Sequence, residues 1–331
     1  MINVGINGLG RIAKSLLVQC VRDKNIKINA INVPDYNINT IVSYLTHDSI
    51  HKETIKKEEI MIIDEHNIAI NNNVIKLINE RVPKEGMWKE RRVQFLFDTT
   101  GQYLSANSAM EHNVDYFIMC APSKDKTPQF VFNGNHNRYN GERIVSNSSC
   151  TTNAIVPLLK ILDDEYQVKS ANFLTVHAAT SSQRVIDGNH LNSRIHRSVF
   201  NNIIPHTTGA SKSAMLVLPH LNGKISGTSV RVPTNNVSMV DLNVKLNTNT
   251  TIYNILYKLR EKIEIEINDD KYLVSSDFMT TTNPTIVDFH ACMSLGNGEY
   301  KFTIWYDNEW SYSSQAIKLL KYMHYNYNKK L

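Results

Sequence analysis

The sequence has few cysteines, and none of them stands in the close pairs that bind structural zinc. Cys20, Cys120, Cys150 and Cys292 are widely spaced along the 331 residues, and no C-x-x-C pair occurs. The sequence therefore predicts no metal site. In a reducing compartment all four side chains are expected to be free thiols.

Long apolar runs and blocks of basic residues are also absent. No run approaches the roughly 20 apolar residues that cross a bilayer, and the start "MINVGINGLG" lacks the regions of a signal peptide. We therefore expect a cytoplasmic protein without a membrane partner. The net charge is +5 but is not gathered into basic blocks, so nucleic acid is not expected as the main partner. A mildly positive surface suits anionic metabolites.

What is present indicates two folded domains. The length exceeds that of a usual single domain, and 42% hydrophobic with 20% charged residues is typical of a globular chain. A strand over 2–7, the turn "GLG", a helix with apolar residues at helical spacing and a strand over 26–33 form a βαβ unit. Further apolar runs at 93–101 and 114–123 complete the pattern of a doubly wound parallel sheet.

The pattern changes after residue 148. Longer strands are predicted at 171–179, 226–234, 237–246 and 299–310, and helices at 252–266 and 311–325. These segments are typical of an α+β domain. The last helix is expected to pack back onto the first domain.

The turn after the first strand carries a pattern for phosphate binding. Gly8, Gly10 and Ala13 fill the G-x-G-x-x-G/A positions at the start of a helix, where the backbone can approach a pyrophosphate. The alternative is an ordinary tight turn. The acidic residue that usually binds the ribose is missing from the end of the second strand: Val33 stands there, and the next acid is Asp35. The choice between NAD and NADP is therefore open.

The segment "SNSSCTTNA" (146–154) places one cysteine among polar neighbours. Ser148 and Ser149 are good amino-terminal caps for a helix that begins near Cys150, which favours a thiolate there. Pro157 argues against one unbroken helix. A buried structural cysteine is the alternative, but the polar neighbours disfavour it. A nucleophilic thiol needs a base, and His177 on an apolar strand is the leading candidate, although spacing alone does not establish the pair.

Taken together, the motifs resemble one known family. In order and over essentially the whole chain, "NGLGRIA", "SCTTNAIVPL", "TVHAAT", "NIIPHTTGASK", "LNGKISGTSVRVPTNNVSMVDL", "VSSDF" and "WYDNEWSYS" are similar to the phosphorylating glyceraldehyde-3-phosphate dehydrogenases. The resemblance implies an α/β fold with a Rossmann-type doubly wound domain at 1–148, to which the helix at 314–331 returns. It also implies an α+β catalytic domain at 149–313 with a mostly antiparallel sheet, and a homotetramer.

The same resemblance implies a reaction and its residues. Glyceraldehyde 3-phosphate would be oxidised to 1,3-bisphosphoglycerate, in glycolysis or gluconeogenesis, through a thiohemiacetal and a thioester on Cys150. His177 would keep the thiolate ionised through an ion pair and act as the base. The implied substrate-phosphate site is Thr180 and Arg231, and the implied inorganic-phosphate site is Ser149, Thr151, Thr208 and Gly209. The implied cofactor residues are Gly8, Gly10, Arg11, Ile12, Thr100, Gly101, Asn308 and Tyr312.

Four positions depart from the family pattern. Val33 replaces the aspartate of NAD-using members, and Asn189 replaces a proline within a segment, 189–197, that is similar to the NADP-tolerant type. Both changes favour use of NADP beside NAD, which remains the expected cofactor. Ala154 replaces a frequent second cysteine. Ser311 replaces a common glycine, and no effect of that change can be derived.

Two other functions compete with this interpretation. Erythrose-4-phosphate dehydrogenase shares the cysteine, the histidine and the fold but lacks the "TTGA" loop, which this chain retains at Thr208 and Gly209. A non-catalytic nucleotide- or RNA-binding relative is the other alternative. Intact Cys150, His177 and Arg231 argue against it, and no basic and aromatic stripe recommends RNA.

Overall fold

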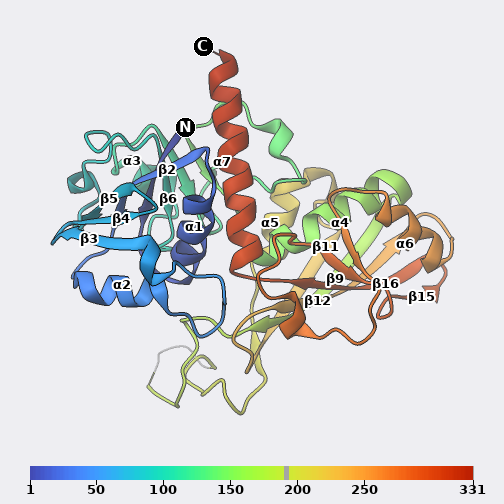
Figure 1. Ribbon diagram of the computed structural model, residues 1–331. Coiled ribbons are helices and arrows are strands. Elements are labelled where there is room, and N and C mark those ends of the chain that lie inside the picture. The colour runs from blue at the N-terminus through green and yellow to red at the C-terminus, as the bar shows by residue number, and fades with distance from the viewer. Residues whose placement is uncertain (190–193, 331) are drawn as a thin grey trace. The chain divides into compact units, whose positions relative to one another are not determined.

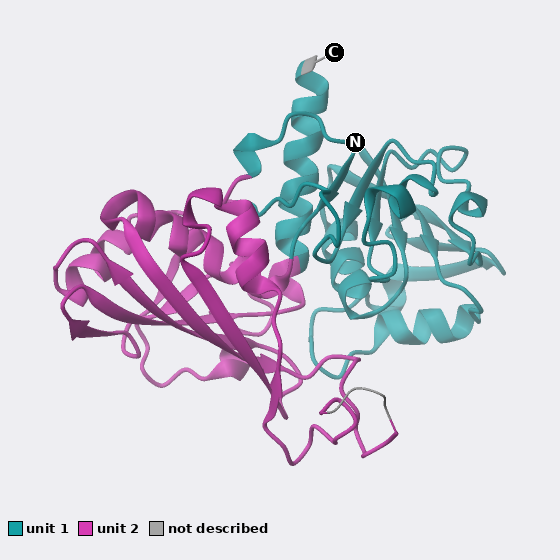
Figure 2. Cartoon of the chain, turned by 180° about the vertical axis from the view of Figure 1, so that it is seen from behind, with its two compact units in different colours: residues 1–132, 136–148, 313–331 teal, residues 133–135, 149–312 magenta. Residues whose placement is uncertain are grey.

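The chain folds into two units, shown in Figure 2. The computed structural model describes residues 1–189 and 194–330. Unit 1 contains Met1–Phe132, His136–Ser148 and the chain from Ser313 onward, and unit 2 contains Asn133–Asn135 and Ser149–Tyr312. Each unit is built on its own sheet.

Unit 1 is a doubly wound α/β structure, as the sequence predicted. Its sheet has the order β3-β4-β5-β2-β1-β6-β7-β8, in which the strands from β5 to β8 are parallel and β3 and β4 are antiparallel. The order reverses between β1 and β6, the usual place for a ligand in such sheets. The strands are β1 (Ile2–Asn7), β2 (Ile26–Asn32), β3 (Ile60–Asp64), β4 (Asn67–Ile70), β5 (Asn73–Ile78), β6 (Phe95–Asp98), β7 (Tyr116–Met119) and β8 (Ile144–Ser146). The helices are α1 (Arg11–Arg22), α2 (Ile38–Thr46), α3 (Ala106–Met110) and most of α7 (Trp310–Lys330), with short 3₁₀ turns at Lys57–Glu59, Pro83–Gly86 and His136–Arg138.

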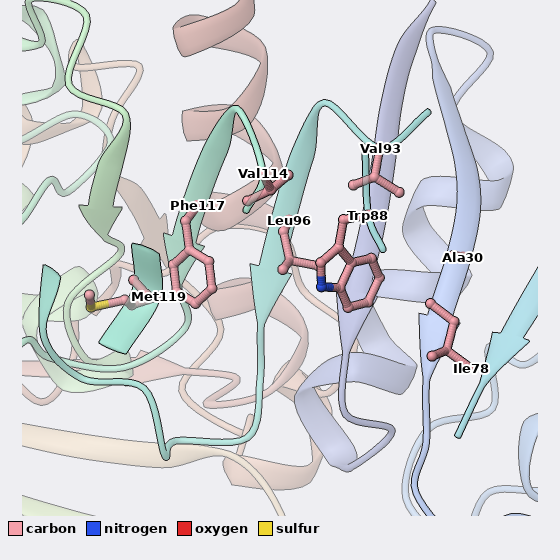
Figure 3. Packing of buried hydrophobic residues seen from close by; sticks show 9 residues of the cluster. Ala30, Ile78, Trp88, Val93, Leu96, Val114, Phe117 and Met119 are labelled. Atoms are coloured by element: carbon pink, nitrogen blue, oxygen red, sulfur yellow. The ribbon is translucent and has the colours of Figure 1, made fainter. Parts of the chain in front are cut away.

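An indole ring fills the space beside the first strand (Figure 3). Trp88 is fully buried and packs with Val93, Leu96 and Phe117 in one apolar cluster. A Cβ atom at Gly5 would lie 2.9 Å from both Trp88 and Val93. The absence of a side chain in the middle of β1 therefore lets the ring pack directly on the strand.

Helix α7 runs beside α1 within unit 1 (Figure 1). The Ser314 hydroxyl donates to the Gln19 Oε1 atom of α1 at 2.6 Å, and Lys321 forms an ion pair with Asp23, the residue that follows α1. Among the described residues, no helix combines the length and the apolar character that a membrane span requires.

Unit 2 is an α+β structure with a mostly antiparallel sheet, which confirms the predicted fold class. The order is β10-β11-β9-β12-β16-β14-β13, with β15 on β16, and only the β9–β11 and β13–β14 pairs are parallel. The strands are β9 (Val168–Ala178), β10 (Ile204–His206), β11 (Ile225–Val232), β12 (Ser238–Leu246), β13 (Glu266–Asn268), β14 (Ile286–Asp288), β15 (Met293–Gly296) and β16 (Glu299–Tyr306). The helices are α4 (Cys150–Tyr166), α5 (Ala210–Val217) and α6 (Ile252–Arg260), with 3₁₀ turns at Pro219–Leu221 and Ser275–Phe278.

Helix α6 is shorter than the sequence predicted. Helical spacing continues to residue 266, but the helix ends at Arg260, and Glu266 already begins β13, where it pairs with Ile286 of β14. The sheet partner decides the conformation of this segment, because strand pairing outweighs a weak local helix preference.

Helix α4 is continuous through its proline, contrary to the expectation that Pro157 would interrupt it. Pro157 has no N–H to donate to the carbonyl of Asn153, one turn earlier. The buried hydroxyl of Thr285 donates to the carbonyl of Ala154 at 2.9 Å and reaches that of Asn153 at 3.5 Å. A side chain distant in sequence thus supplies a donor at the position where the proline removes one.

Candidate active site

Cys150 is the first residue of α4, and the helix is capped immediately before it. Ser149 is the cap, as predicted, and its Oγ accepts a hydrogen bond from the backbone N–H of Thr152 at 3.0 Å. Ser148 lies in the left-handed region with φ of 57°, a conformation that is strained for a residue with a side chain and is often found at functional sites. The sulfur therefore lies at the positive end of the helix dipole.

His177 lies close to this sulfur. It is the penultimate residue of β9, and its Nε2 atom is 3.4 Å from the Cys150 Sγ atom. The imidazole is 6% exposed. The 3.4 Å separation is within hydrogen-bonding distance for sulfur, so the structure brings together the two residues that sequence spacing alone could not pair.

Arg231 reaches the other side of the imidazole. Its strand, β11, is parallel to β9, and Arg231 lies opposite His177 in the register, so the two side chains project from the same face of the sheet. The Nη1 atom lies 2.6 Å from the Nδ1 atom of His177 and 3.1 Å from the carbonyl oxygen of Ala178.

Burial governs the protonation of the pair. Burial raises the pKa of the Cys150 thiol, while the Arg231 guanidinium and a hydrogen bond from the Thr151 N–H act to lower this pKa. Burial, followed by repulsion from Arg231, lowers the pKa of His177 to about 3. Burial therefore opposes ionisation of both side chains, whereas Arg231 and the start of α4 favour the thiolate, and the ion pair expected from the sequence stays a prediction.

Tyr306 belongs to this site, although the sequence analysis did not select it. Its hydroxyl is fully buried, 2.8 Å from the Thr151 Oγ1 and 2.9 Å from the Thr175 Oγ1. Burial raises the pKa of Tyr306 well above its usual range, so the hydroxyl stays protonated. The Thr151 hydroxyl is thereby engaged inside the unit. The position of Tyr306 inside "WYDNEW" was the available sequence signal.

Three further predicted anion-site residues lie on loops of unit 2. Thr180 is exposed and donates to the Gln183 Oε1 atom at 2.9 Å. The Thr208 Oγ1 accepts from the N–H of Ala210 at 3.1 Å. Gly209 is exposed and caps α5 without a side-chain hydrogen bond. Helix N–H groups without a side-chain cap suit an anion. None of the hydrogen bonds of Thr180 or Thr208 described here involves Cys150.

The glycine turn of unit 1 has the shape that a pyrophosphate requires. Gly8 has φ of 93°, and a Cβ atom there would lie 2.8 Å from the Thr99 Oγ1 and 3.1 Å from the Thr100 side chain. Gly10 caps α1 without a side-chain hydrogen bond, and the space where its Cβ would stand is open. Gly101 follows β6 with φ of 67° and is likewise open. The turn after β1 and the loop after β6, together called the dinucleotide cradle, lie side by side and leave the close access that a dinucleotide phosphate needs.

Buried acids support this cradle and were not foreseen. Asp48 accepts from the Arg11 Nη1 at 2.7 Å and from the Lys14 Nζ at 2.8 Å. Although burial opposes ionisation, these two cations hold the pKa of Asp48 below its usual range. The ion pair with Asp48 holds the Arg11 side chain in place. At the next residue, the carbonyl oxygen of Ile12 accepts a hydrogen bond from the Ser313 hydroxyl at 3.5 Å.

A second buried acid ends β6. Asp98 accepts hydrogen bonds from the Asn7 Nδ2 at 2.9 Å and the Thr100 Oγ1 at 2.8 Å. Burial nevertheless raises the pKa of Asp98 to about 6. Nearby, burial lowers the pKa of His112 to about 4, and its Nε2 lies 3.4 Å from the Asn7 Nδ2.

Asn308 is oriented by a hydrogen-bond chain within unit 2. The Ala178 N–H donates to the Ser238 Oγ at 3.0 Å, and the Ser238 hydroxyl donates to the Asn308 Oδ1 at 2.9 Å. This arrangement leaves the Nδ2 of Asn308 as the group that can donate to a ligand. Tyr312 is buried near the start of α7.

The residues that bear on cofactor choice follow β2. The backbone N–H of Val33 donates to the carbonyl of Ile78, and two residues later Asp35, with φ of 56°, forms an ion pair with Arg81. Arg81 is a nearby cation that the sequence analysis did not identify. Asn189 is exposed. Residues 190–193, within the segment that is similar to the NADP-tolerant type, lie outside the described residues. Among those described, no three His, Cys, Asp or Glu side chains form a group that could hold a metal ion.

A glycine turn on a doubly wound sheet and a cysteine–histidine pair on an α+β unit are typical of a nicotinamide-dependent oxidoreductase. Comparison with family models specifies which one. The model for "Glyceraldehyde 3-phosphate dehydrogenase, NAD binding domain" matches residues 2–106, and the model for the C-terminal domain of the same enzyme matches residues 149–308. The chain belongs to the glyceraldehyde 3-phosphate dehydrogenase family.

Similar proteins agree with this assignment over the full length. Glyceraldehyde-3-phosphate dehydrogenase from Bacteroides fragilis is 37% identical over 97% of this chain and 98% of its own. Glyceraldehyde-3-phosphate dehydrogenase 1 from Kluyveromyces marxianus is 36% identical over 98% and 100% of the two chains. The cytosolic enzyme from Taxus baccata is 35% identical over 97% of each. The family resemblance inferred from the motifs is therefore confirmed.

Proposed function

We propose that this protein oxidises glyceraldehyde 3-phosphate in the presence of inorganic phosphate and yields 1,3-bisphosphoglycerate, a step of glycolysis or gluconeogenesis. The observation that carries the proposal is the 3.4 Å contact between the Cys150 Sγ and the His177 Nε2 at the amino terminus of α4. A thiol and a base at this distance can form and break a covalent bond to an aldehyde carbon.

The reaction begins with addition of the Cys150 sulfur to the aldehyde. The His177 Nε2 takes the thiol proton and returns it to the oxygen of the adduct, which forms a thiohemiacetal. The backbone N–H at the start of α4 stabilises negative charge on that oxygen during the addition. When the hydride leaves, His177 accepts the hydroxyl proton and a thioester remains on Cys150. A bound nicotinamide ring supplies the acceptor for the hydride.

Phosphate then releases the acyl group. Inorganic phosphate attacks the thioester, the Cys150 thiolate leaves, and His177 returns a proton to the sulfur. The inorganic-phosphate site is proposed to use Ser149, Thr151, Thr208 and Gly209. The substrate phosphate is proposed to contact Thr180 and Arg231, whose guanidinium offers a pair of donors.

The proposed cofactor is NAD, with NADP also accepted. Gly8, Gly10, Arg11, Ile12, Thr100 and Gly101 would hold the dinucleotide, and Asn308 and Tyr312 the nicotinamide. Val33 has no carboxylate that would repel a 2′-phosphate. Arg81, which follows β5 and forms an ion pair with Asp35, is a cation close to the end of β2. The kcat/KM values with NAD and NADP test this proposal. A hundredfold preference for NAD, about 2.7 kcal/mol, would contradict use of NADP.

The assembly and location complete the proposal. Residues 1–148 with the helix at 314–331 would form the dinucleotide-binding domain and 149–313 the catalytic domain of a cytoplasmic homotetramer. Large apolar side chains stay exposed on one segment of unit 2, namely Val185, Ile186, Phe200 and Ile203, which suits contact with a second copy. Sedimentation equilibrium measures the number of copies.

The competing functions make different predictions. Erythrose-4-phosphate oxidation releases its product to water, whereas the retained Thr208 and Gly209 favour attack by phosphate. Turnover that does not depend on phosphate would support the erythrose enzyme. A non-catalytic binder predicts no aldehyde oxidation, so labelling of Cys150 by iodoacetate that tracks the loss of aldehyde oxidation would exclude it.

One assay tests the proposed function directly. The purified chain is given glyceraldehyde 3-phosphate while NAD, NADP and phosphate are varied independently, and reduced cofactor is measured by absorbance. Cys150→Ser should abolish oxidation. Cys292 is a half-buried thiol of the same unit, and Cys292→Ser is the control that should leave oxidation unchanged. Oxidation that survives in Cys150→Ser would refute the mechanism.

A further inference from the structure

Three polar side chains lie buried side by side where parallel strands of unit 1 end. Asn7, Asn32 and Asp98 are the last residues of β1, β2 and β6, and the strand register places Asn7 directly between the other two. The turn after β1 begins at Gly8 and the loop after β6 begins at Thr99. The buried residues at the ends of β1 and β6 therefore directly precede the two parts of the dinucleotide cradle.

A chain of hydrogen bonds runs through these side chains and ends on the carboxylate. The Asn32 Nδ2 donates to the Asn7 Oδ1 at 2.9 Å, and the Asn7 Nδ2 donates to the Asp98 Oδ1 at 2.9 Å. Asn32 is held in turn by both backbone groups of Glu80, at 2.8 and 3.0 Å. Because the Asn7 amide accepts on one side and donates on the other, Asp98 is the acceptor that completes the chain.

The same carboxylate oxygen also holds the loop after β6. The Thr100 hydroxyl donates to the Asp98 Oδ1 at 2.8 Å, and the backbone N–H groups of Thr100 and Gly101 act on the carboxylate as further donors. Asp98 therefore contacts the loop through Thr100 and the turn after β1 through Asn7. One buried oxygen atom joins the two parts of the cradle, whose spacing decides whether a pyrophosphate fits.

The other oxygen of this carboxylate has no such support. Within the described residues the Asp98 Oδ2 atom has no hydrogen-bond partner, and the largest stabilising contributions to the charge come from uncharged donors. A buried carboxylate without a paired cation is costly, and burial raises the pKa of Asp98 to about 6. An asparagine could accept the same two bonds without a buried charge, so a purely structural role does not explain the acid. Residues that cost stability in this way are expected at functional sites.

The neighbouring ionisable groups do not compensate the charge of Asp98. The groups that interact with it or with its partners are Tyr103 before α3, His112 after α3, Cys120 after β7 and, next to Cys120, Cys20 on α1. Burial raises the pKa of the phenol and of both thiols and lowers the pKa of His112 to about 4, so all four are uncharged at neutral pH. The cations at the start of α1, Arg11 and Lys14, are paired with Asp48.

We propose that Asp98 positions the dinucleotide cradle through Asn7 and Thr100, and that it takes up a proton when the pyrophosphate of the cofactor binds. The inference rests on the proposed function, because it assigns the cradle to NAD. The two phosphates bring negative charge beside the buried carboxylate, and a like charge disfavours its ionised form. A proton from solvent joins the Oδ2 atom, while Oδ1 continues to accept from Asn7 and Thr100. The positioning bonds thus survive the neutralisation.

The proton makes cofactor affinity depend on pH. The free carboxyl group ionises as pH rises through about 6, whereas the bound state keeps its proton to higher pH. The affinity for a ligand with a pyrophosphate should therefore fall as pH rises from about 6 to about 8. Below about pH 5 the acid is neutral in both states, and no proton uptake by Asp98 is expected.

Calorimetric titration of the full chain with ADP-ribose measures the proton uptake. This ligand has the pyrophosphate but no nicotinamide, so its binding does not involve the nicotinamide end of the cofactor site. Titrations at neutral pH in buffers of different ionisation enthalpy count the protons that are bound. The parent should take up a fraction of a proton that Asp98→Asn, which cannot ionise, does not take up. Adenosine, which has no phosphate, should cause no uptake in either protein.

A second variant tests the positioning role. Asp98→Ala removes the acceptor of both hydrogen bonds and should weaken ADP-ribose binding about fivefold or more. It should also raise the KM for NAD while kcat at saturating NAD changes little. Asp98→Asn keeps an acceptor oxygen and should bind ADP-ribose at least as tightly as the parent. Asp288 is a buried acid at the end of β14 in unit 2. Asp288→Ala is the matched control, which should lower Tm but leave ADP-ribose affinity and proton uptake unchanged.

Two results would overturn the proposal: equal proton uptake in the parent and Asp98→Asn, or an Asp98→Ala protein that binds ADP-ribose as tightly as the parent. If Asp98→Ala does not fold, the proton count of Asp98→Asn decides alone. Oxidation of glyceraldehyde 3-phosphate is measured on the same samples. Oxidation by a parent whose proton uptake equals that of Asp98→Asn refutes this inference alone. Proton uptake that depends on Asp98, without any oxidation, refutes the proposed function alone.

Discussion

The hydroxyl of Thr285 should stabilise unit 2 because of the proline in α4. Thr285→Val keeps the shape of the side chain but removes the donor to the carbonyls of Ala154 and Asn153. Loss of a buried hydrogen bond that leaves an acceptor without its donor costs about 1–3 kcal/mol. For a domain of 150–250 residues this lowers Tm by about 2–4 °C per kcal/mol. Differential scanning calorimetry at fixed protein concentration measures the change.

The proline itself provides the decisive control. In a Pro157→Ala background residue 157 regains an N–H and can donate to Asn153 within the helix, so Thr285→Val should lower Tm by clearly less than in the parent. Such a difference between the two backgrounds is the coupling between the sites. An equal loss of Tm in both backgrounds would show that the hydroxyl does not compensate for the proline. Thr303→Val is the matched control, because the Thr303 hydroxyl donates to the carbonyl of Ala291 away from α4.

Three other outcomes are expected from unit 1. Gly8→Ala should destabilise the protein by about 1–2 kcal/mol, since φ of 93° suits only glycine; an unchanged Tm would show that the turn relaxes. Asp98 has a folded pKa of about 6, above the ordinary 3.8, so its contribution to stability falls as pH rises from about 4 to 6. Asp98→Asn should therefore gain stability relative to the parent over that range, by at most about 3 kcal/mol, and Tm measured against pH should show a difference that grows with pH. Val33→Asp should lower kcat/KM with NADP more than with NAD, and equal losses would place cofactor choice elsewhere.

Local patterns predicted the elements around the dinucleotide cradle well. The strand at 2–7, the glycine turn and the helix that follows are encoded by consecutive residues, so periodicity and glycine spacing identify them directly. The strand that carries His177 was likewise visible as an apolar run. Where a neighbouring strand decides the conformation, as at Glu266, the pattern of a single segment was insufficient.

The site itself depended on contacts that no local pattern contains. Cys150 and His177 could be paired only through the family resemblance, and the buried acid Asp48 was missed because its partners come from a distant segment. Asp48 is 37 residues from Arg11 along the chain. The protonation of the cysteine–histidine pair stays a prediction for a related reason. Helix dipoles can be inferred from a sequence, but the extent of burial appears only when the chain is folded.

The parallel pairing of β9 and β11 makes the chemistry depend on strand alignment. Because His177 and Arg231 are direct neighbours across the two strands, a slip of β11 by one residue would turn the guanidinium to the opposite face of the sheet. Length changes in the connection between the strands are therefore tolerable only when they leave this alignment intact. Engineering of that connection to alter assembly would therefore risk a loss of catalytic activity, although it would replace no catalytic side chain.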